Sequence, residues 1–216
     1  MFEKISWNKT GLEIEKESFE CIDKIADKTN FSPEQWHVVR RLIHTTADFS
    51  IADNVEFSND PINNGLKALF QGATIITDSN MIKAGLSVVK LKNFNRKYER
   101  EAIKCFIADE DIVKIAQEKN ITRALASVEK AKNILDGAIF LCGNAPLALV
   151  GVIKLVVEEN IKPALIIGMP VGFVNVCESK ELLKEIDVPY ITIQGRRGGS
   201  PLAVAALHGI IENKQL

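Results

Sequence analysis

The chain has 216 residues, of which 46% are hydrophobic and 25% charged, and its formal net charge is -1 at pH 7. This length and composition are typical of a globular α/β protein, and we expect a single domain over residues 1–216 with a substantial hydrophobic core. The balanced charge gives no broad basic field for nucleic acid or an acidic membrane, no apolar stretch reaches membrane-spanning length, and the first residues do not form a signal peptide.

The cysteine pattern bears on the cellular compartment. The four cysteines are scattered, without the C-x-x-C spacing of a zinc or redox site, and three of them lie in apolar runs. The four cysteines are Cys21, Cys105, Cys142 and Cys177. We expect them to be reduced core thiols of a cytoplasmic protein, and to form neither a zinc site nor disulfides.

The N-terminal segment predicts a short lead-in followed by a helix. Residues 1–12 are expected to be irregular, and apolar residues at helical spacing then predict an amphipathic helix over about 13–28. Ser18 lies on the apolar side of this helix. A serine in that place usually bonds a nearby backbone carbonyl, and the alternative is a contact with a ligand.

A second helix is expected over residues 32–48. Ser32 is a good N-cap, proline follows at the first helical position, and Gln35 completes a capping box. Its last turns carry His44, where the helix dipole favours imidazolium, while the arginines one turn earlier (Arg40 and Arg41) oppose it.

His44 is accordingly a candidate proton donor near neutral pH. The alternative is an ordinary surface or half-buried histidine with a satisfied hydrogen bond. A metal site on His44 and Asp48, four residues apart, would lack a third ligand within reach by sequence.

A repeating pattern occupies the rest of the chain. After a polar connector over residues 49–64, which overlaps a short helix over about 61–71, apolar strand-like runs alternate with helices. The expected strands are residues 73–77, 104–108, 138–142, 164–167 and 190–193. The expected helices are about 80–87, 109–119, 122–135, 146–159, 178–186 and 201–212.

This alternation predicts a mainly parallel sheet covered on both faces, which is a Rossmann-like three-layer α/β/α fold with extra N-terminal helices. Right-handed crossovers bring all the strand-to-helix turns to one edge of such a sheet. The charged stretch 92–100 is expected to be a solvated loop, or a basic rim to a site at that edge.

Three glycine-bearing turns follow strands at this edge: 143–146, 168–173 and 195–201. Small residues allow backbone N–H groups to approach a ligand, and the arginines of the last turn can hold a carboxylate or phosphate. The turns therefore predict a shared site for an anionic ligand, although each alone is explained as a tight connection. Asn144 is a turn former or a ligand donor, and Arg123, at a helix start, contacts an anion or solvent.

Several common motifs are missing. The sequence has no G-x-G-x-x-G fingerprint and no Walker pattern, so a nicotinamide or ATP site is not supported. It also has no G-x-S-x-G elbow and no H-E-x-x-H zinc helix.

Several segments together resemble the precorrin-8X methylmutase family, whose anaerobic-pathway members are called cobalt-precorrin-8 methylmutases. The resemblance covers nearly the whole chain, from about residue 14 to about 207, in the family's order and approximate spacing. The segments are Arg-Arg-Leu-Ile-His at 40–44, 72–81, Thr-Arg at 122–123, Gly-Asn-Ala-Pro at 143–146, Gly-Met-Pro-Val-Gly-Phe at 168–173 with Glu-Ser-Lys at 178–180, and Gly-Arg-Arg-Gly-Gly-Ser at 195–200. Residues 45–48 lack the small glycine that many relatives have after the histidine.

The resemblance implies an isomerase of cobalamin biosynthesis. Such enzymes move a methyl group from C-11 to C-12 of the macrocycle of precorrin-8 or its cobalt form, giving hydrogenobyrinic or cobyrinic acid. No cofactor is implied, because the reaction is a rearrangement within one molecule. Family members are homodimers with the site near the subunit interface.

The resemblance also implies site residues. The family histidine matches His44 and is thought to protonate the macrocycle. The substrate is a flat apolar ring rimmed by carboxylates, which suits the anionic site expected at the sheet edge. The implied substrate-binding residues are Ser18, Arg40, Ser87, Arg123, Asn144, Val171, Gly172, Phe173, Arg196, Gly198, Gly199 and Ser200.

Two other functions stay open at this point. A non-catalytic corrinoid carrier needs the same pocket but not His44. A nucleotide-dependent dehydrogenase or transferase could use the same fold, but the missing phosphate fingerprint opposes it.

Overall fold

The computed structural model describes residue 5 and residues 7–213, and it is built around one six-stranded sheet. The strands are β1 (Val55–Ser58), β2 (Ile75–Thr77), β3 (Ile103–Lys104), β4 (Ile139–Cys142), β5 (Leu165–Gly168) and β6 (Tyr190–Ile193). Their order is β1-β6-β5-β4-β2-β3, and every neighbouring pair is parallel except β1 and β6.

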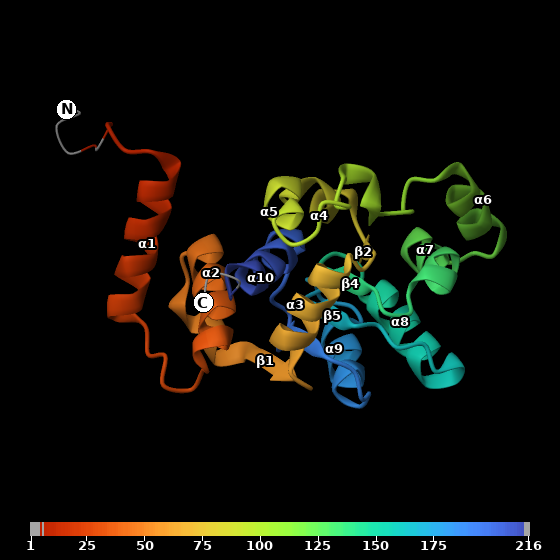
Figure 1. The fold of residues 1–216 in the computed structure, drawn as a ribbon. Coiled ribbons are helices and arrows are strands. Elements are labelled where there is room, and N and C mark those ends of the chain that lie inside the picture. Colours follow the sequence, from red (N-terminus) through yellow and green to blue (C-terminus); the bar gives the residue numbers. More distant parts are fainter. Residues whose placement is uncertain (1–4, 6, 214–216) are drawn as a thin grey trace.

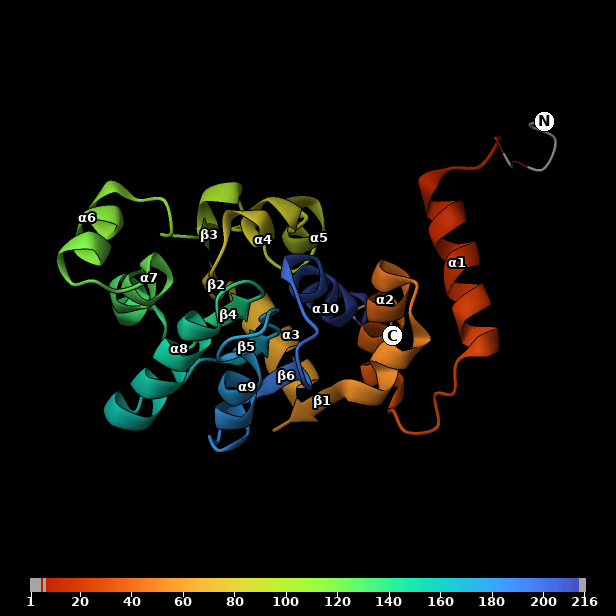
Figure 2. The ribbon, with the colours of Figure 1, turned by 180° about the vertical axis from the view of Figure 1, so that it is seen from behind.

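Helices cover both faces of this sheet, so the expected three-layer α/β/α fold is confirmed (Figures 1 and 2). The helices are α1 (Gly11–Ile25), α2 (Pro33–Thr46), α3 (Pro61–Gln71), α4 (Asn80–Gly85), α5 (Val88–Lys92), α6 (Glu110–Glu118), α7 (Arg123–Ala131), α8 (Pro146–Glu159), α9 (Val176–Lys184) and α10 (Ser200–Glu212). Short 3-10 turns lie at Phe49–Asn54, Arg100–Ala102 and Lys132–Ile134. Across residue 5 and residues 7–213, no helix combines the length and apolar character that a membrane crossing needs.

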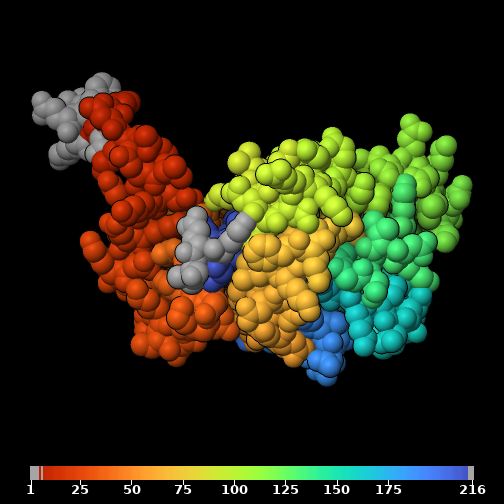
Figure 3. Space-filling model, in the orientation of Figure 1, coloured from red at the N-terminus to blue at the C-terminus, as the bar shows by residue number. Residues whose placement is uncertain are grey.

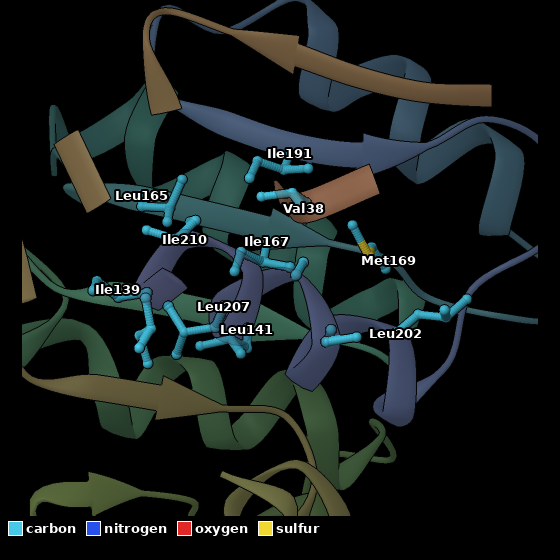
Figure 4. Close-up of a cluster of buried hydrophobic side chains, with 14 of the residues drawn as sticks. Val38, Ile139, Leu141, Leu165, Ile167, Met169, Ile191, Leu202, Leu207 and Ile210 are labelled. Carbon is cyan, nitrogen blue, oxygen red and sulfur yellow. The ribbon is translucent and has the colours of Figure 1, made fainter. Parts of the chain in front are cut away.

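Two hydrophobic layers hold the sheet between the helices. Successive residues of a strand point to opposite faces, so Ile139 and Leu141 face α2 and α10, whereas Phe140 faces α7 and α8. Figure 4 shows the first layer, in which side chains of β4, β5 and β6 meet side chains of α2 and α10. The labelled residues of this layer are Val38, Ile139, Leu141, Leu165, Ile167, Met169, Ile191, Leu202, Leu207 and Ile210.

The contact between α2 and α10 fixes the helix that carries His44. The two helices approach so closely at Gly209 that an added Cβ there would lie 2.5 Å from the Cα of Val38. The N-terminus of α2 has the expected capping box between Ser32 and Gln35. At its other end, Ala47 adopts the left-handed conformation with φ 53°, where glycine is the usual residue.

Three expected features were wrong in detail. Residues 55–58, expected within a connector, form the edge strand β1. The strand was missed because it is only half-buried and lacks the continuous apolar run of the parallel strands. The expected helix over 80–87 ends at Gly85, because Leu86 is extended and buried, and a separate helix that was not expected, α5, follows from Val88. The stretch 92–100 is only partly solvated, because Phe94 and Tyr98 are buried and the Tyr98 hydroxyl donates to the Ala73 carbonyl at 3.0 Å.

Candidate active site

The loops that follow the parallel strands lie together at one edge of the sheet. At that edge the turn after β4 abuts the start of α10, since a Cβ on Gly143 would lie 2.7 Å from the Ser200 nitrogen. The turn after β6 contacts the turn after β5, because the Gly199 amide donates to the Met169 carbonyl at 2.8 Å. The three glycine-bearing turns singled out in the sequence are thus neighbours in space.

Asp78 fills the position between β2 and β4 where the strand order reverses. Its carboxylate is buried and accepts the backbone N–H groups of Gly143 (3.2 Å), Asn144 (2.8 Å) and Ala145 (2.7 Å), just before α8 begins. In open α/β sheets this is the place where a phosphate commonly binds. Here the Asp78 carboxylate already accepts from these amides, which disfavours the binding of a nucleotide phosphate at the turn after β4. The expectation that the amides of this turn face a ligand was therefore wrong.

The loops after β5 and β6 form one cross-linked surface. Gly198 lies against the backbone of the other loop, since a Cβ on it would be 2.3 Å from the Met169 carbonyl oxygen. The Gly172 amide donates to the Arg196 carbonyl at 3.3 Å. The Arg196 guanidinium lies 5.8 Å from the centre of the Phe173 ring, whose side chain is 86% exposed.

These two loops therefore present apolar and cationic groups side by side. Val171 is also exposed, at 46%. Ser200 is buried at the start of α10, where its hydroxyl lies 3.0 Å from that of Ser79. The arrangement suits a ligand that combines an apolar body with carboxylates.

His44 is exposed in the last turns of α2 and packs against α1. Its ring meets the Phe19 ring edge-on, with 5.3 Å between the ring centres. The end of this helix is tied to the loop after β6, because Asp48 forms an ion pair with Arg197 at 2.9 Å. Among the described residues, no group of three His, Cys, Asp or Glu side chains is placed to hold a metal ion.

The two arginines before His44 are engaged with acidic residues. Arg40 forms an ion pair with Asp23 at 3.1 Å, and its guanidinium lies 4.3 Å from the centre of the Phe19 ring. Arg41 is buried and pairs with Glu15 at 2.9 Å and with Glu212. The positive charge that the sequence places one turn before His44 is therefore largely balanced by carboxylates.

Two hollows flank α2. A cleft of about 560 Å³, visible between α1 and the segment containing α5 in Figure 3, is lined by Arg40, Phe19 and Lys90 among others. A groove of about 320 Å³ lies between α2, α4 and α10 and is lined by Thr45, Ser200 and, among others, Met81, Pro201 and His208. The second hollow joins the residue after His44 to the start of α10.

His208, from α10, lines this groove. His208 is buried, and the Ser87 amide donates to its Nε2 at 3.2 Å. Burial, together with the nearby charges of Lys90 and Arg41, lowers the pKa of His208 to about 4, so the ring is neutral at pH 7. The Ser87 hydroxyl caps α5 by accepting from the Lys90 amide.

The remaining predicted residues are more scattered. The Ser18 hydroxyl donates to the Ile14 carbonyl at 2.8 Å, which is the ordinary arrangement for a helical serine. The Asn144 side chain is exposed at the sheet edge. Arg123 is exposed at the start of α7, beside a hollow lined by α6, and Figures 1 and 2 both place α7 at the opposite end of the sheet from α2. Within one chain, Arg123 therefore lies far from His44.

Sequence reasoning passed over the residues that support these loops. Asp78 received no role of its own within the family-like segment 72–81, although an aspartate directly after a buried strand, at a predicted sheet edge, was an available signal. Lys180 is almost completely buried in α9, where it donates to two carbonyls of the loop after β6. The family resemblance includes Lys180 within 178–180, but nothing in the sequence indicates that its side chain reaches the loop after β6.

Comparison with known proteins agrees with this architecture. The family model described as Precorrin-8X methylmutase matches residues 13–213. A cobalt-precorrin-8 methylmutase of Leptospira interrogans is 44% identical over 209 residues, which cover 93% of both chains. A protein with the same name from Methanocaldococcus jannaschii is 42% identical, covering 94% of both chains.

Solved structures give the same result. The crystal structure of a precorrin-8X methylmutase from Thermus thermophilus is similar to this chain with a TM-score of 0.83 and 44% sequence identity. The similarity covers 94% of this chain and 95% of the other.

Proposed function

The chain belongs to the precorrin-8X methylmutase family, and on this premise we propose that it moves a methyl group from C-11 to C-12 of a precorrin-8 corrinoid, with His44 as proton donor. The chain is an isomerase of cobalamin biosynthesis. The product is cobyrinic acid when the substrate contains cobalt and hydrogenobyrinic acid when it does not.

This reaction asks little of the protein beyond binding and a proton. The bond between the methyl carbon and C-11 breaks and a bond to C-12 forms within the same molecule, so the composition of the macrocycle does not change. No oxidant or reductant is consumed. A proton delivered by His44 to the conjugated ring withdraws electron density from it and favours the migration, which is general acid catalysis. The ring returns a proton to the imidazole after the methyl group has moved, so the composition is unchanged.

The observation that carries the proposal is the position of His44. Its imidazole is exposed at the end of α2, next to Thr45 of the groove that reaches Ser200. The Phe19 ring packs edge-on against it and limits its orientation. The neighbouring loops offer Arg196 to a substrate carboxylate and Phe173 to the flat ring.

The proposed binding surface combines these loops with the residues around them. We assign contacts with the ring to Val171, Gly172 and Phe173, and contacts with its carboxylates to Arg196 and the start of α10. Asn144, Ser87, Ser18 and Arg40 are further candidates. Their own hydrogen bonds and ion pairs, described above, would have to coexist with the substrate or be exchanged for it.

A second copy of the chain would complete the site. The groove of about 320 Å³ would take only part of a corrin macrocycle. The exposed Phe173 and the remote Arg123 are both available to a partner. We therefore propose a cytoplasmic homodimer of a single-domain subunit, with Arg123 contributed to the site by the partner.

Turnover tests the role of His44. Purified protein is mixed with cobalt-precorrin-8, and in parallel with metal-free precorrin-8, and the conversion is followed by absorbance and by chromatography of the product. His44→Ala is expected to lower kcat by about 10²–10⁴-fold, as for the loss of a general acid. His37→Ala, which removes the other imidazole of the same helix, serves as the matched control and is expected to keep most of the activity.

The outcomes separate the hypotheses. Full activity in His44→Ala would remove this residue from the mechanism. A wild-type protein that binds the corrinoid tightly without converting it would be a carrier, and the proposed reaction would be wrong.

A further inference from the structure

A buried lysine of α9 binds the backbone of the loop that carries Arg196. Lys180 lies in α9 with only 1% of its surface exposed. Its Nζ donates to the Gly195 carbonyl at 2.8 Å and to the Arg197 carbonyl at 2.6 Å. These two carbonyls flank Arg196 on either side.

The Arg196 carbonyl is also occupied. It accepts the Gly172 amide of the loop after β5 at 3.3 Å. Three consecutive carbonyls, from residue 195 to residue 197, therefore have fixed partners in neighbouring elements. The backbone around Arg196 is fixed, while its guanidinium stays exposed beside Phe173.

This arrangement is unusual in its energetics. A buried ammonium normally requires a carboxylate partner, because removing its charge from water is costly. Within the part of the chain that the structure describes, no carboxylate lies within ion-pair distance of Lys180. Its ammonium donates to the two carbonyls, and burial lowers its pKa to about 8. An apolar side chain of similar length would satisfy the packing of α9 at lower cost, so stability alone does not account for a lysine here.

We propose that Lys180 is a positioning residue that fixes the Arg196 loop so that the guanidinium meets a carboxylate of the macrocycle without further ordering. This inference rests on the proposed function, because it takes the ligand of Arg196 to be the corrinoid. Preorganisation of a loop improves binding by removing the entropy that ordering would otherwise cost.

The test compares Lys180→Met with the wild type. The variant keeps the length and packing of the side chain but lacks the donors, so we expect KM for cobalt-precorrin-8 to rise about tenfold while kcat changes about twofold or less. Hydrogen exchange of the amides at residues 195–198 should become faster in the variant, while that of β4 and β5 stays unchanged. Lys180→Arg, which retains donors, should recover part of the loss in KM.

A matched control lies one turn further along the same helix. Lys184→Met removes the same charge, but Lys184 is paired with Glu56 and Glu181 at 3.1 Å each, and these contacts do not involve the carbonyls of residues 195–197. It should leave KM and loop exchange unchanged. If Lys180→Met does not fold, Lys180→Gln, whose neutral amide is one atom shorter and a weaker donor, should show the same changes in KM and loop exchange to a smaller extent.

The outcomes distinguish this inference from the proposed function. A folded Lys180→Met with unchanged KM and unchanged exchange at 195–198 would overturn the positioning role. Faster exchange with unchanged KM would also overturn it, because the loop would then be held for stability alone. If the wild type neither binds nor converts the corrinoid, the proposed function fails, and this would be evident before any variant is compared.

Discussion

At the residue scale, two charged side chains, those of Asp78 and Lys180, hold the backbone of loops at the sheet edge. The Asp78 carboxylate, only 4% exposed, gathers three successive N–H groups at the point where α8 is about to begin. A carboxylate at a helix N-terminus also interacts favourably with the helix dipole. Asp78 thereby does internally what a bound phosphate does in nucleotide-binding proteins of similar fold.

The first prediction concerns this carboxylate. Asp78→Asn replaces one acceptor oxygen with an NH₂ group that faces N–H donors, so buried polar groups lose their partners. We expect the free energy of unfolding to fall by about 2–4 kcal/mol, measured by urea denaturation. Asp136→Asn is the matched control, because its exposed carboxylate accepts a single amide, that of Lys162 at 2.9 Å. An equal loss in both variants would contradict the special role of Asp78.

The second prediction concerns the buried His208. Its pKa is about 4 in the folded protein and about 6.5 when the chain is unfolded. Between these values the unfolded chain binds more protons, so stability is fully present above pH 6.5 and is lost as the pH falls towards 4. Glu15 opposes this shift, and Lys90 and Arg41 support it.

The measurement is a series of urea denaturations between pH 7 and pH 5. Relative to His208→Gln, which has no group that titrates here, the wild type should lose about 2 kcal/mol over this interval. Parallel curves for the two proteins would mean that His208 is protonated in the fold and that its contact with the Ser87 amide is not maintained.

At the element scale, the sequence predicts what depends on local pattern. The five parallel strands begin and end within two residues of their expected places, apart from the shorter β3, because each is a short apolar run bounded by turn residues. The helix over 61–71 begins and ends where its proline and Gly72 indicate. The edge strand β1 was missed because its pairing with β6 depends on residues far away in the chain, and no local signal identifies that partner.

The packing of α2 on α10 is a further property that the sequence does not show. It depends on Gly209, where the two backbones meet, and on the buried side chains of both helices. Nothing in the helical pattern distinguishes this glycine from others. Its position nevertheless determines how far the His44 helix lies from the start of α10.

The third prediction follows from this contact. Gly209→Ala should destabilise the protein by about 1–3 kcal/mol, because the new Cβ meets the backbone of Val38, which cannot move aside as a side chain can. The gain in helix propensity of about 1 kcal/mol only partly offsets this. Gly151→Ala in α8 is the control, since its Cβ would meet the side chains of Leu125 and Val128. Thermal unfolding of both variants, compared with the wild type, decides the point, and a Gly209→Ala variant as stable as Gly151→Ala would contradict it.

At the scale of the whole molecule, the candidate site is an assembly of loop ends. Sequence order alone predicted that the turns after β4, β5 and β6 would share an edge, because parallel strands joined by right-handed crossovers allow nothing else. It did not predict that Asp78 and Lys180 occupy the polar groups of those turns, since such contacts depend on side-chain packing across the sheet. The proposed role of His44 comes from the family resemblance, whereas its neighbours, such as Phe19, are known only from the fold.

The position of Arg123 leads to the last prediction. In one chain α7 and α2 lie at opposite ends of the sheet (Figures 1 and 2), so Arg123 and His44 can serve one substrate only if they come from two subunits. In that case His44→Ala and Arg123→Ala damage different halves of each site. Each variant alone should lose most activity, through kcat for the first and through KM for the second.

Mixing the two variants after dissociation and reassociation provides the test. Random pairing places half of the subunits in mixed dimers, and each mixed dimer has one site with both residues intact, so activity should recover to about a quarter of the wild-type value. If both residues acted within one chain, every site would carry one lesion and no activity would return. Mixing each variant with itself under the same treatment controls for losses during reassociation. Recovery well above that control supports a site shared between subunits, whereas activity that stays at the level of the separate variants contradicts the contribution of Arg123 by the partner.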